Sequence, residues 1–172
     1  MNPKNFKELL KNIKAMVFDV DGVLTDGSLI LMPEGELVRT MNIRDGIAMK
    51  LAVKKGLKIC IITGGSNAMV KQRLNRLGIS DVYLKTEAKW EALKEFMAAN
   101  HLMPEEILYL GDDLVDYEAM TKVGIPACPK DAVAEIKDIS IYVSDKDGGK
   151  GCVRDVIEQV LKVQDKWKIP YF

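Results

Sequence analysis

The stretch Ala15-Met16-Val17-Phe18-Asp19-Val20-Asp21-Gly22 decides the fold of this chain. Four consecutive apolar side chains lead directly into two aspartates that stand two residues apart. A segment that is apolar at every position is typical of a strand buried on both faces, as in a parallel sheet covered by helices. Because ligands bind such sheets at the carboxyl ends of the strands, we expect Asp19 and Asp21 at a binding edge.

Short apolar runs of this kind recur along the chain and alternate with segments of helical spacing. One helical segment places Val70, Leu74 and Leu77 on one face and ends at Gly78. The alternation predicts an α/β fold, with a doubly wound, mostly parallel, Rossmann-like sheet and helices on both faces. The length of 172 residues predicts a single domain over residues 1–172. The predicted strands are Ala15–Val20, Leu57–Ile62, Asp81–Leu84, Ile107–Leu110, Ile125–Cys128 and Ile139–Val143.

One segment, at about residues 26–41, departs from this alternation. The apolar runs Leu29–Met32 and Leu37–Met41 flank Pro-Glu-Gly-Glu, which predicts a β-hairpin inserted after the first strand. A hairpin this small cannot bury its own apolar side chains. We therefore expect it to pack against another subunit, and the alternative is that it folds back onto its own sheet.

Composition restricts the class of protein. The 25 Lys and Arg residues balance the 25 Asp and Glu residues, which argues against nucleic acid or an anionic membrane as the main partner. No apolar run exceeds four residues, so neither a transmembrane helix nor a signal-peptide core is expected. Cys60, Cys128 and Cys152 form no metal or disulfide pattern, and the predicted location is the reducing cytoplasm.

Carboxylates follow two of the predicted strands. Asp19 and Asp21 follow the first, and a second group lies in Gly111-Asp112-Asp113-Leu114-Val115-Asp116. Like charges this close raise one another's pKa unless a cation offsets them, and an all-oxygen ligand set suits Mg²⁺. A single aspartate after a strand is more often a turn former or helix cap, and Asp113 fits that description. Two such groups on separate strand ends favour a magnesium site.

Thr63-Gly64 and Lys89 are expected at the same edge. With Thr86 as the N-cap, Lys89 falls in the first turn of a helix, where the macrodipole disfavours a cation. A lysine kept there indicates a nearby anion, either a phosphate or a carboxylate. The alternative is an ordinary solvent-exposed lysine.

An Asp-x-Asp pair fits phosphoryl transfer through a covalent intermediate. Asp19 would attack phosphorus, and Asp21 would protonate the leaving oxygen and then deprotonate the hydrolytic water. Thr63, backbone amides near Gly64 and the charge of Lys89 would hold the phosphoryl oxygens. The sequence therefore predicts a phosphatase.

In order and spacing, these segments resemble the four motifs of the haloacid dehalogenase superfamily. The resemblance implies an aspartate nucleophile and Mg²⁺ dependence. It also implies that Asp113 and Asp116 support the metal's water shell or position Lys89. The implied metal ligands are Asp19, Asp21 through its carbonyl, and Asp112, and the implied phosphate-binding residues are Thr63 and Lys89.

Only the hairpin separates the first motif from the first helix, so the chain is similar to capless members with such a hairpin, the 3-deoxy-D-manno-octulosonate (KDO) 8-phosphate phosphatases. The resemblance extends to Asn42-Ile43-Arg44-Asp45-Gly46, Val70–Leu74 and Gly148–Arg154. It implies a phosphorylated sugar-acid substrate, a place in lipopolysaccharide sugar synthesis, and a homotetramer that forms through the hairpins. The implied substrate-binding residues are Gly64, Asn42, Asp45, Arg73 and Arg154.

Gly65-Ser66 stands where many members have a basic residue after Thr-Gly. The related alternative is a phosphatase of a nine-carbon sugar acid, KDN or N-acylneuraminate 9-phosphate. A phospho-accepting receiver domain is a remote alternative, since its phosphorylated aspartate follows a later strand. His101 reads as a helix-end residue rather than a base. The apolar tail Trp167–Phe172 docks either on the fold or on a neighbour.

Overall fold

The computed structural model of the protein describes residues 6–168. Within that range, six strands form one sheet in which every neighbouring pair is parallel. The ends of the predicted domain and most of the apolar tail, residues 1–5 and 169–172, lie outside the described residues. In spatial order the strands are β5 (Asp81–Tyr83), β4 (Lys58–Ile62), β1 (Ala15–Phe18), β6 (Ile107–Leu110), β7 (Ile125–Cys128) and β8 (Tyr142–Val143).

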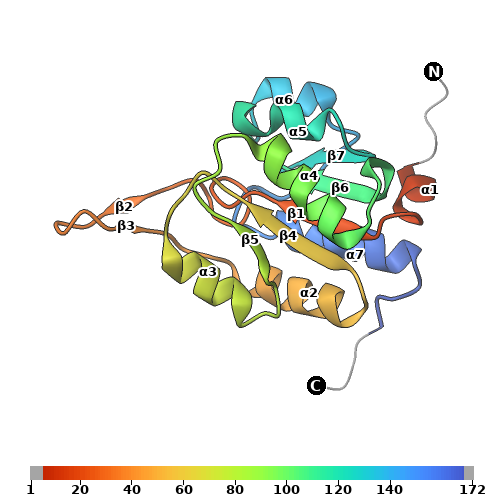
Figure 1. Ribbon diagram of the computed structural model, residues 1–172, viewed down its shortest axis with the longest axis horizontal. Coiled ribbons are helices and arrows are strands. Elements are labelled where there is room, and N and C mark those ends of the chain that lie inside the picture. Colours follow the sequence, from red (N-terminus) through yellow and green to blue (C-terminus); the bar gives the residue numbers. More distant parts are fainter. Residues whose placement is uncertain (1–5, 169–172) are drawn as a thin grey trace.

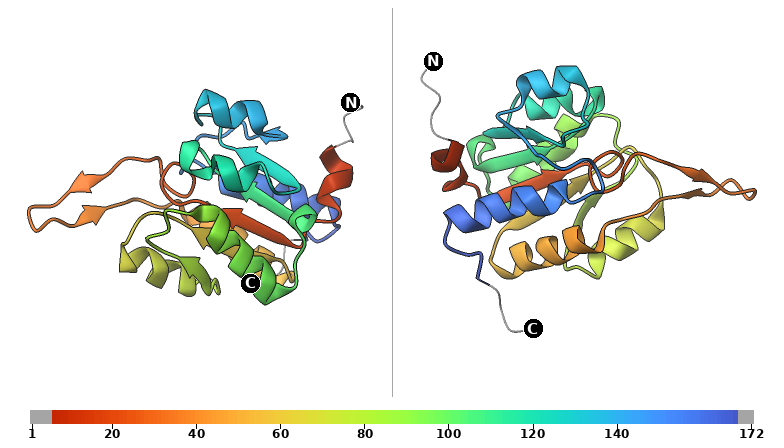
Figure 2. Two further views of the ribbon diagram at one scale, coloured as in Figure 1. Left: turned by 45° about the horizontal axis from the view of Figure 1, so that its top comes forward. Right: turned by 180° about the vertical axis from the view of Figure 1, so that it is seen from behind.

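Helices cover both faces of the sheet because its strands are apolar on both sides (Figures 1 and 2). Met16 and Phe18 pack toward one face, and the intervening Val17 packs toward the other. The first face carries α1 (Phe6–Leu10), α2 (Ile43–Lys54), α3 (Ala68–Asn75) and α7 (Cys152–Val163). The second carries α4 (Lys89–Asn100), α5 (Tyr117–Met120) and α6 (Ala134–Ile139). The short 3₁₀ turns are η1 (Pro104–Glu106) and η2 (Leu114–Asp116). The predicted doubly wound α/β sheet is confirmed.

The chain moves outward from β1 through β4 to β5 and then returns to β6, which pairs with the other side of β1. A crevice forms at the carboxyl ends of strands where the order reverses in this way. The topology therefore places the segments after β1 and β6 next to each other, and each of these segments carries aspartates.

Four strand boundaries differ from the prediction. Strand β4 begins at Lys58 and β5 ends at Tyr83, each one residue shorter than predicted. Strand β1 ends at Phe18 because the chain turns there, and the amides of Val23 and Thr25 donate back to the carbonyl of Val20. The predicted strand Ile139–Val143 is wrong at its start, since Ile139 is the last residue of α6 and only Tyr142–Val143 pairs with β7. Ile139 still packs on the core, so its apolar side chain correctly indicated burial, although the residue lies in a helix rather than in a strand.

The hairpin extends away from the body of the molecule, as Figure 1 shows. Its strands β2 (Ile30–Leu31) and β3 (Leu37–Val38) pair antiparallel, with Leu31 opposite Leu37. Leu31 is 74% exposed, and Leu29, Ile30, Met32 and Leu37 are exposed as well, whereas Val38 and Met41 near the base are partly buried. The hairpin thus does not fold back onto its own sheet. None of the described helices is both long and apolar enough to cross a membrane.

Candidate active site

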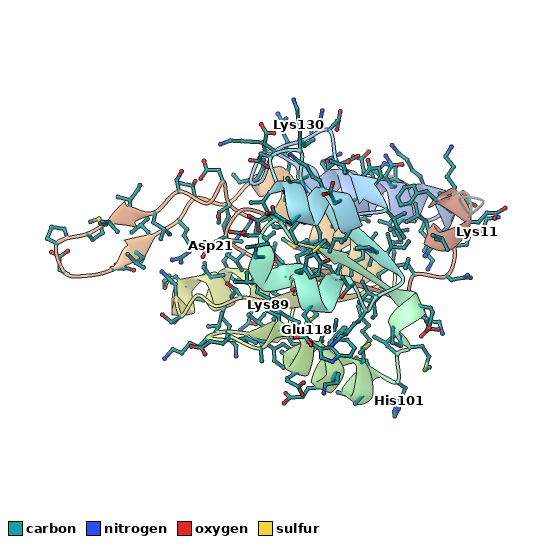
Figure 3. The ribbon with its side chains drawn as sticks, turned by 90° about the horizontal axis from the view of Figure 1, so that it is seen from above. Lys11, Asp21, Lys89, His101, Glu118 and Lys130 are labelled. Carbon is teal, nitrogen blue, oxygen red and sulfur yellow. The ribbon has the colours of Figure 1, made fainter. Side chains whose placement is uncertain are left out.

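The predicted catalytic residues gather at the carboxyl edge of the sheet. They come from the loop after β1, the end of β4, the first turn of α4 and the segment after β6. In Figure 3, Asp21 and Lys89 lie toward the hairpin end of the molecule, and His101 lies at the opposite end. His101 is the C-cap of α4, with the left-handed φ of 53°, as expected for a helix-end residue.

Lys89 is a buried cation held between two carboxylates. Its Nζ atom lies 2.6 Å from Asp19 Oδ2 and 2.7 Å from Asp116 Oδ1, and the residue is 4% exposed. Burial opposes its charge, but attraction to Asp116 and Asp19 outweighs burial and raises the pKa of Lys89. Lys89 is the first residue of α4, so the cation that the macrodipole disfavours there is offset by neighbouring carboxylates.

The predicted N-cap of α4 is wrong. Ala88 occupies that position without a side-chain hydrogen bond, and the Thr86 hydroxyl donates instead to the carbonyl of Leu84. The amide of Thr86 donates to the carbonyl of Thr63, which ties the approach to α4 to the end of β4. The helix start is therefore fixed by backbone pairing and by the ion pairs of Lys89 rather than by a capping hydroxyl.

Asp116 organises this cluster from beneath. It is fully buried, and it accepts hydrogen bonds from Lys89 Nζ, from the Tyr109 hydroxyl at 2.8 Å and from the Asp112 amide at 3.2 Å. A Cβ at Gly111 would approach the Asp116 carboxyl within 2.6 Å, so the Asp116 side chain can occupy this position only because residue 111 has no side chain. Tyr109 was not predicted as part of the site because it lies in an apolar strand that signals only burial.

The carboxylates of Asp19, Asp112 and Asp116 are close enough to share a cation. One oxygen from each lies within 4.8 Å of the others. Burial and the charge of Asp116 raise the pKa of Asp19 to about 7, against the opposing effect of Lys89. Burial and the charge of Asp19 raise the pKa of Asp112 to about 8. Such shifts are expected where carboxylates are placed together for a metal ion.

The donor set fits Mg²⁺. Asp112 Oδ1 is buried and receives a hydrogen bond from no group in residues 6–168, whereas both Asp116 oxygens already have donors. A Cβ at Gly22 would overlap Asp112 Oδ2, so this glycine is needed for the two loops to meet. Asp112 therefore has a free oxygen for a hard cation, and Asp19, whose oxygens contact the Val20 amide and Lys89, lies next to it. Asp113 is exposed, and its carboxylate accepts from the Leu114 amide as a helix cap.

Thr63 and Asp21 stand on the other side of the crevice. Thr63 is 3% exposed, and its Oγ1 accepts a hydrogen bond from the Gly65 amide at 3.1 Å. Asp21 accepts two hydrogen bonds from Arg39, at 2.6 Å from Nε and 3.0 Å from Nη2. Arg39 was missed in the sequence, where the only signal is a cation at the end of an apolar hairpin strand.

Among the predicted substrate-binding residues, Gly64 and Arg73 lie in grooves beside the hairpin. Gly64 is exposed in a groove that residues 35–37 and Arg39 of the hairpin also line. Arg73 lines a second groove together with Arg39, Met41 and Asn67. Both residues are thus accessible next to the pair formed by Arg39 and Asp21.

Asn42, Asp45 and Arg154 have structural partners instead. Asn42 caps α2 and donates to the carbonyl of Gly149. Asp45 is 1% exposed, its Oδ1 accepts from the Arg154 amide at 2.7 Å, and burial raises its pKa to about 6. The Arg154 guanidinium donates to Glu158 and stacks over the Trp167 ring. These contacts join α2 to α7. Asn42 and Arg154 also line a surface groove, and contact of the three residues with substrate stays a prediction.

The glycine-rich segment before α7 packs directly on the loop that carries Asp19 and Asp21. The Gly149 amide donates to the carbonyl of Val23, and Lys150 pairs with Asp26. A Cβ at Gly148 would overlap the carbonyl oxygen of Gly22. The end of the chain therefore supports the catalytic loop near its beginning.

Comparison with known proteins identifies the family. The model of the haloacid dehalogenase-like hydrolases matches residues 35–129. The chain is 35% identical over 155 residues to the KDO 8-phosphate phosphatase of Yersinia pestis, covering 90% of this chain and 83% of that protein. A crystal structure of the Y. pestis phosphatase superposes with a TM-score of 0.92 at 33% identity, covering 95% of this chain and 88% of that one.

A second crystal structure shows a ligand-bound relative. It is the KDO 8-phosphate phosphatase of Moraxella catarrhalis in complex with a magnesium ion, a phosphate ion and KDO. The two chains superpose with a TM-score of 0.91 at 33% identity, covering 94% of this chain and 92% of that one. The buried aspartates with Lys89, the strand order and these similarities lead to one assignment: the chain belongs to the haloacid dehalogenase-like hydrolases.

Proposed function

We propose that this protein hydrolyses KDO 8-phosphate to KDO and inorganic phosphate, with Mg²⁺ as cofactor. The observation that carries the proposal is the buried group of Asp19, Asp112, Asp116 and Lys89 at the switch point of the sheet. The substrate follows from the similarity to phosphatases of that name and to the relative with magnesium, phosphate and KDO bound.

The proposed chemistry proceeds in two steps. An Asp19 oxygen attacks phosphorus, the bond from phosphorus to the sugar oxygen breaks, and Asp21 donates a proton to that oxygen as it leaves. Asp21 then takes a proton from water, which attacks the aspartyl-phosphate, releases inorganic phosphate and restores Asp19. Lys89 and Thr63 hold the phosphoryl oxygens.

Mg²⁺ would be held by Asp19, by Asp112 and, as the family resemblance implies, by the carbonyl of Asp21. When bound, it supplies positive charge that offsets the crowded carboxylates and the phosphoryl group. Asp116 acts through Lys89, whose ammonium it holds at 2.7 Å, and through the Asp112 amide.

The exposed apolar hairpin supports a homotetramer in which neighbouring subunits help to complete the sugar-binding pocket. Gly64 and Arg73, which line grooves beside the hairpin, are the proposed contacts to the sugar acid. The three buried free cysteines are consistent with a reducing compartment. We place the reaction in the cytoplasm, in the synthesis of the lipopolysaccharide sugar.

The test is Mg²⁺-dependent phosphate release from KDO 8-phosphate, KDN 9-phosphate and N-acetylneuraminate 9-phosphate, with Asp19→Asn as the control. We expect kcat/KM to favour KDO 8-phosphate by about a hundredfold or more, and we expect Asp19→Asn to release no phosphate. A preference for a nine-carbon sugar acid would change the substrate assignment and leave the proposed mechanism in place. Release by Asp19→Asn at the wild-type rate would refute the covalent mechanism.

A further inference from the structure

The contact between Arg39 and Asp21 connects the hairpin to the predicted acid. Arg39 follows β3 and lies 18 residues after Asp21 in the chain. Its Nε and Nη2 donate to the two different oxygens of the Asp21 carboxylate, and its Nη1 donates to the carbonyl of Leu37. Three guanidinium nitrogens are therefore engaged, and the planar group has one orientation relative to the carboxylate.

Arg39 is better buried than its partner. Its side chain is 8% exposed and that of Asp21 is 36% exposed. The Arg39 side chain borders a small apolar cavity that Val20, Val70 and Leu84 also line. The hydrogen bonds of Asp21 raise the pKa of the Arg39 guanidinium, so its charge is secure. A buried guanidinium thus holds a more exposed carboxylate.

The contact between Arg39 and Asp21 lies beside Gly65. A Cβ at Gly65 would lie 3.5 Å from Arg39 Nη2, 3.7 Å from Asp21 Oδ2 and 3.4 Å from Thr63 Oγ1. The guanidinium therefore reaches the point where Asp21 and Thr63 face each other. Figure 3 shows Asp21 near the base of the hairpin.

We propose that Arg39 is a positioning residue that orients the Asp21 carboxylate for proton transfer. This inference rests on the proposed function, in which Asp21 is the general acid and base. A carboxylate has about four lone-pair sites, so two hydrogen bonds from Arg39 fix the plane of the group and leave each oxygen able to meet the leaving group or the water. The hairpin thereby sets the geometry of the proton transfer.

If Arg39 acts through Asp21, the effect of losing Arg39 should depend on the leaving group of the substrate. A sugar alkoxide needs a proton as it departs, whereas p-nitrophenolate is stable as an anion and gains little from a general acid. Loss of Arg39 should therefore lower kcat/KM, which reports the step in which the leaving group departs, for alkyl phosphates and leave kcat/KM for an aryl phosphate nearly unchanged. A residue that only supports the fold would slow both.

The experiment measures Arg39→Met, Asp21→Asn and the double variant that carries both substitutions. The control is Lys58→Met, which removes a cation at the exposed amino end of β4. Each is assayed at saturating Mg²⁺ with KDO 8-phosphate, ribose 5-phosphate and p-nitrophenyl phosphate. We expect Arg39→Met to lower kcat/KM for both sugar phosphates by about ten- to a thousandfold and to leave kcat/KM for the aryl phosphate near the wild-type value. The second step, in which Asp21 takes a proton from water, is common to all three substrates and affects kcat alone. The double variant should be no slower than Asp21→Asn, and Lys58→Met should match the wild type.

Other outcomes overturn the inference. A higher KM for KDO 8-phosphate with unchanged kcat, and normal ribose 5-phosphate kinetics, would make Arg39 a ligand of the substrate carboxylate. Equal losses of kcat/KM on all three substrates, or additive losses in the double variant, would also reject positioning. If Arg39→Met does not fold, Arg39→Lys serves instead, with the same leaving-group dependence expected at smaller size because lysine lacks the two-point fork.

The proposed function fails separately. If the wild type ignores KDO 8-phosphate, the substrate assignment is wrong, and the comparison of ribose 5-phosphate with the aryl phosphate still tests Arg39. If Asp21→Asn itself shows no dependence on the leaving group, Asp21 is not the acid, and the inference about Arg39 fails with that assignment.

Discussion

Lys89 is the residue on which the charge balance of the site depends. Its ammonium lies within 2.7 Å of both Asp19 and Asp116, and all three residues are nearly or fully buried. Removing one partner from a buried ion pair leaves the other charge unpaired in a medium of low dielectric constant. The cost of that unpaired charge exceeds the net stabilisation that the intact pair provides. At this position, stability and catalysis depend on the same atom.

We therefore expect Lys89→Met to lose phosphatase activity and to lower the free energy of unfolding by about 3–5 kcal/mol in Mg²⁺-free buffer. Urea unfolding and phosphate release measure the two effects, and Lys58→Met is the control for loss of a lysine charge. A variant as stable as the wild type would show that the two carboxylates do not need this cation.

The raised pKa of Asp45 should make the free energy of unfolding depend on pH. Burial raises its pKa from 3.8 to about 6, so the folded state binds a proton more tightly than the unfolded state. The stabilisation from this proton is complete below about pH 4 and is lost as the pH rises through 6. The total is about 2–3 kcal/mol for a shift of this size.

Asp45→Asn cannot lose that proton, and its amide oxygen can still accept from the Arg154 amide. Its free energy of unfolding relative to the wild type should therefore increase by about 2–3 kcal/mol between pH 4 and pH 7. Urea titrations of both proteins at several pH values test this, because the contributions of other groups cancel in the difference. A difference that does not change with pH would contradict the shift.

The predictability of single residues followed their sequence context. Asp19, Asp21, Thr63, Lys89 and Asp112 stand at strand ends or a helix start, where a polar group after an apolar run is visible in the sequence. Arg39 and Tyr109 reach the site through the folding of the hairpin and through one face of a buried strand, and neither is visible from spacing. The catalytic and substrate-binding roles remain predictions.

At the scale of elements, the glycine-rich segment before α7 acts as a support for the catalytic loop. A Cβ at Gly148 would overlap backbone atoms of Gly22, and backbone atoms cannot rotate aside as a side chain can. Gly148→Ala should therefore displace the loop, lower the free energy of unfolding by about 1–3 kcal/mol and reduce kcat.

Gly56→Ala is the matched control. Gly56 has a φ of +85° but no atom within 4 Å of an added Cβ, so its substitution brings strain of about 1 kcal/mol without a clash and far from the site. Denaturation and steady-state kinetics on both variants separate the two effects. Normal kcat in Gly148→Ala would show that the segment is not a support.

Element types were more predictable than element ends. The apolar runs of β1, β4, β6 and β7 identify buried strands, because both faces of each are covered. The start of α4 and the segment around Ile139 were assigned incorrectly, since backbone hydrogen bonds to distant segments decide those boundaries. Local sequence does not contain such partners.

At the scale of the whole molecule, the exposed hairpin predicts assembly. Leu31 is 74% exposed, so Leu31→Glu should not disturb an isolated chain, but it would place a charge in an apolar contact between subunits. We expect the wild type to sediment as a tetramer and Leu31→Glu as a smaller species, with Glu34→Gln, near the hairpin tip, unchanged. A monomeric wild type would refute the proposed assembly.

The sheet order belongs to this scale as well. Alternating strands and helices predicted an α/β class, and the capless doubly wound fold is confirmed. The position of β1 between β4 and β6 depends on packing between segments far apart in the chain. No local pattern contains that arrangement, although it is what brings the two groups of aspartates together.

The contact of Gly149 with Val23 has a consequence for the order in which the protein becomes active. The segment that supports the catalytic loop emerges from the ribosome more than a hundred residues after the loop itself. At roughly 5–20 residues per second, many seconds pass between the synthesis of Asp19 and that of the segment before α7 that supports its loop. Competence for turnover should thus arise only after the glycine-rich segment and α7 have been made, and a chain terminated before α7 should be inert.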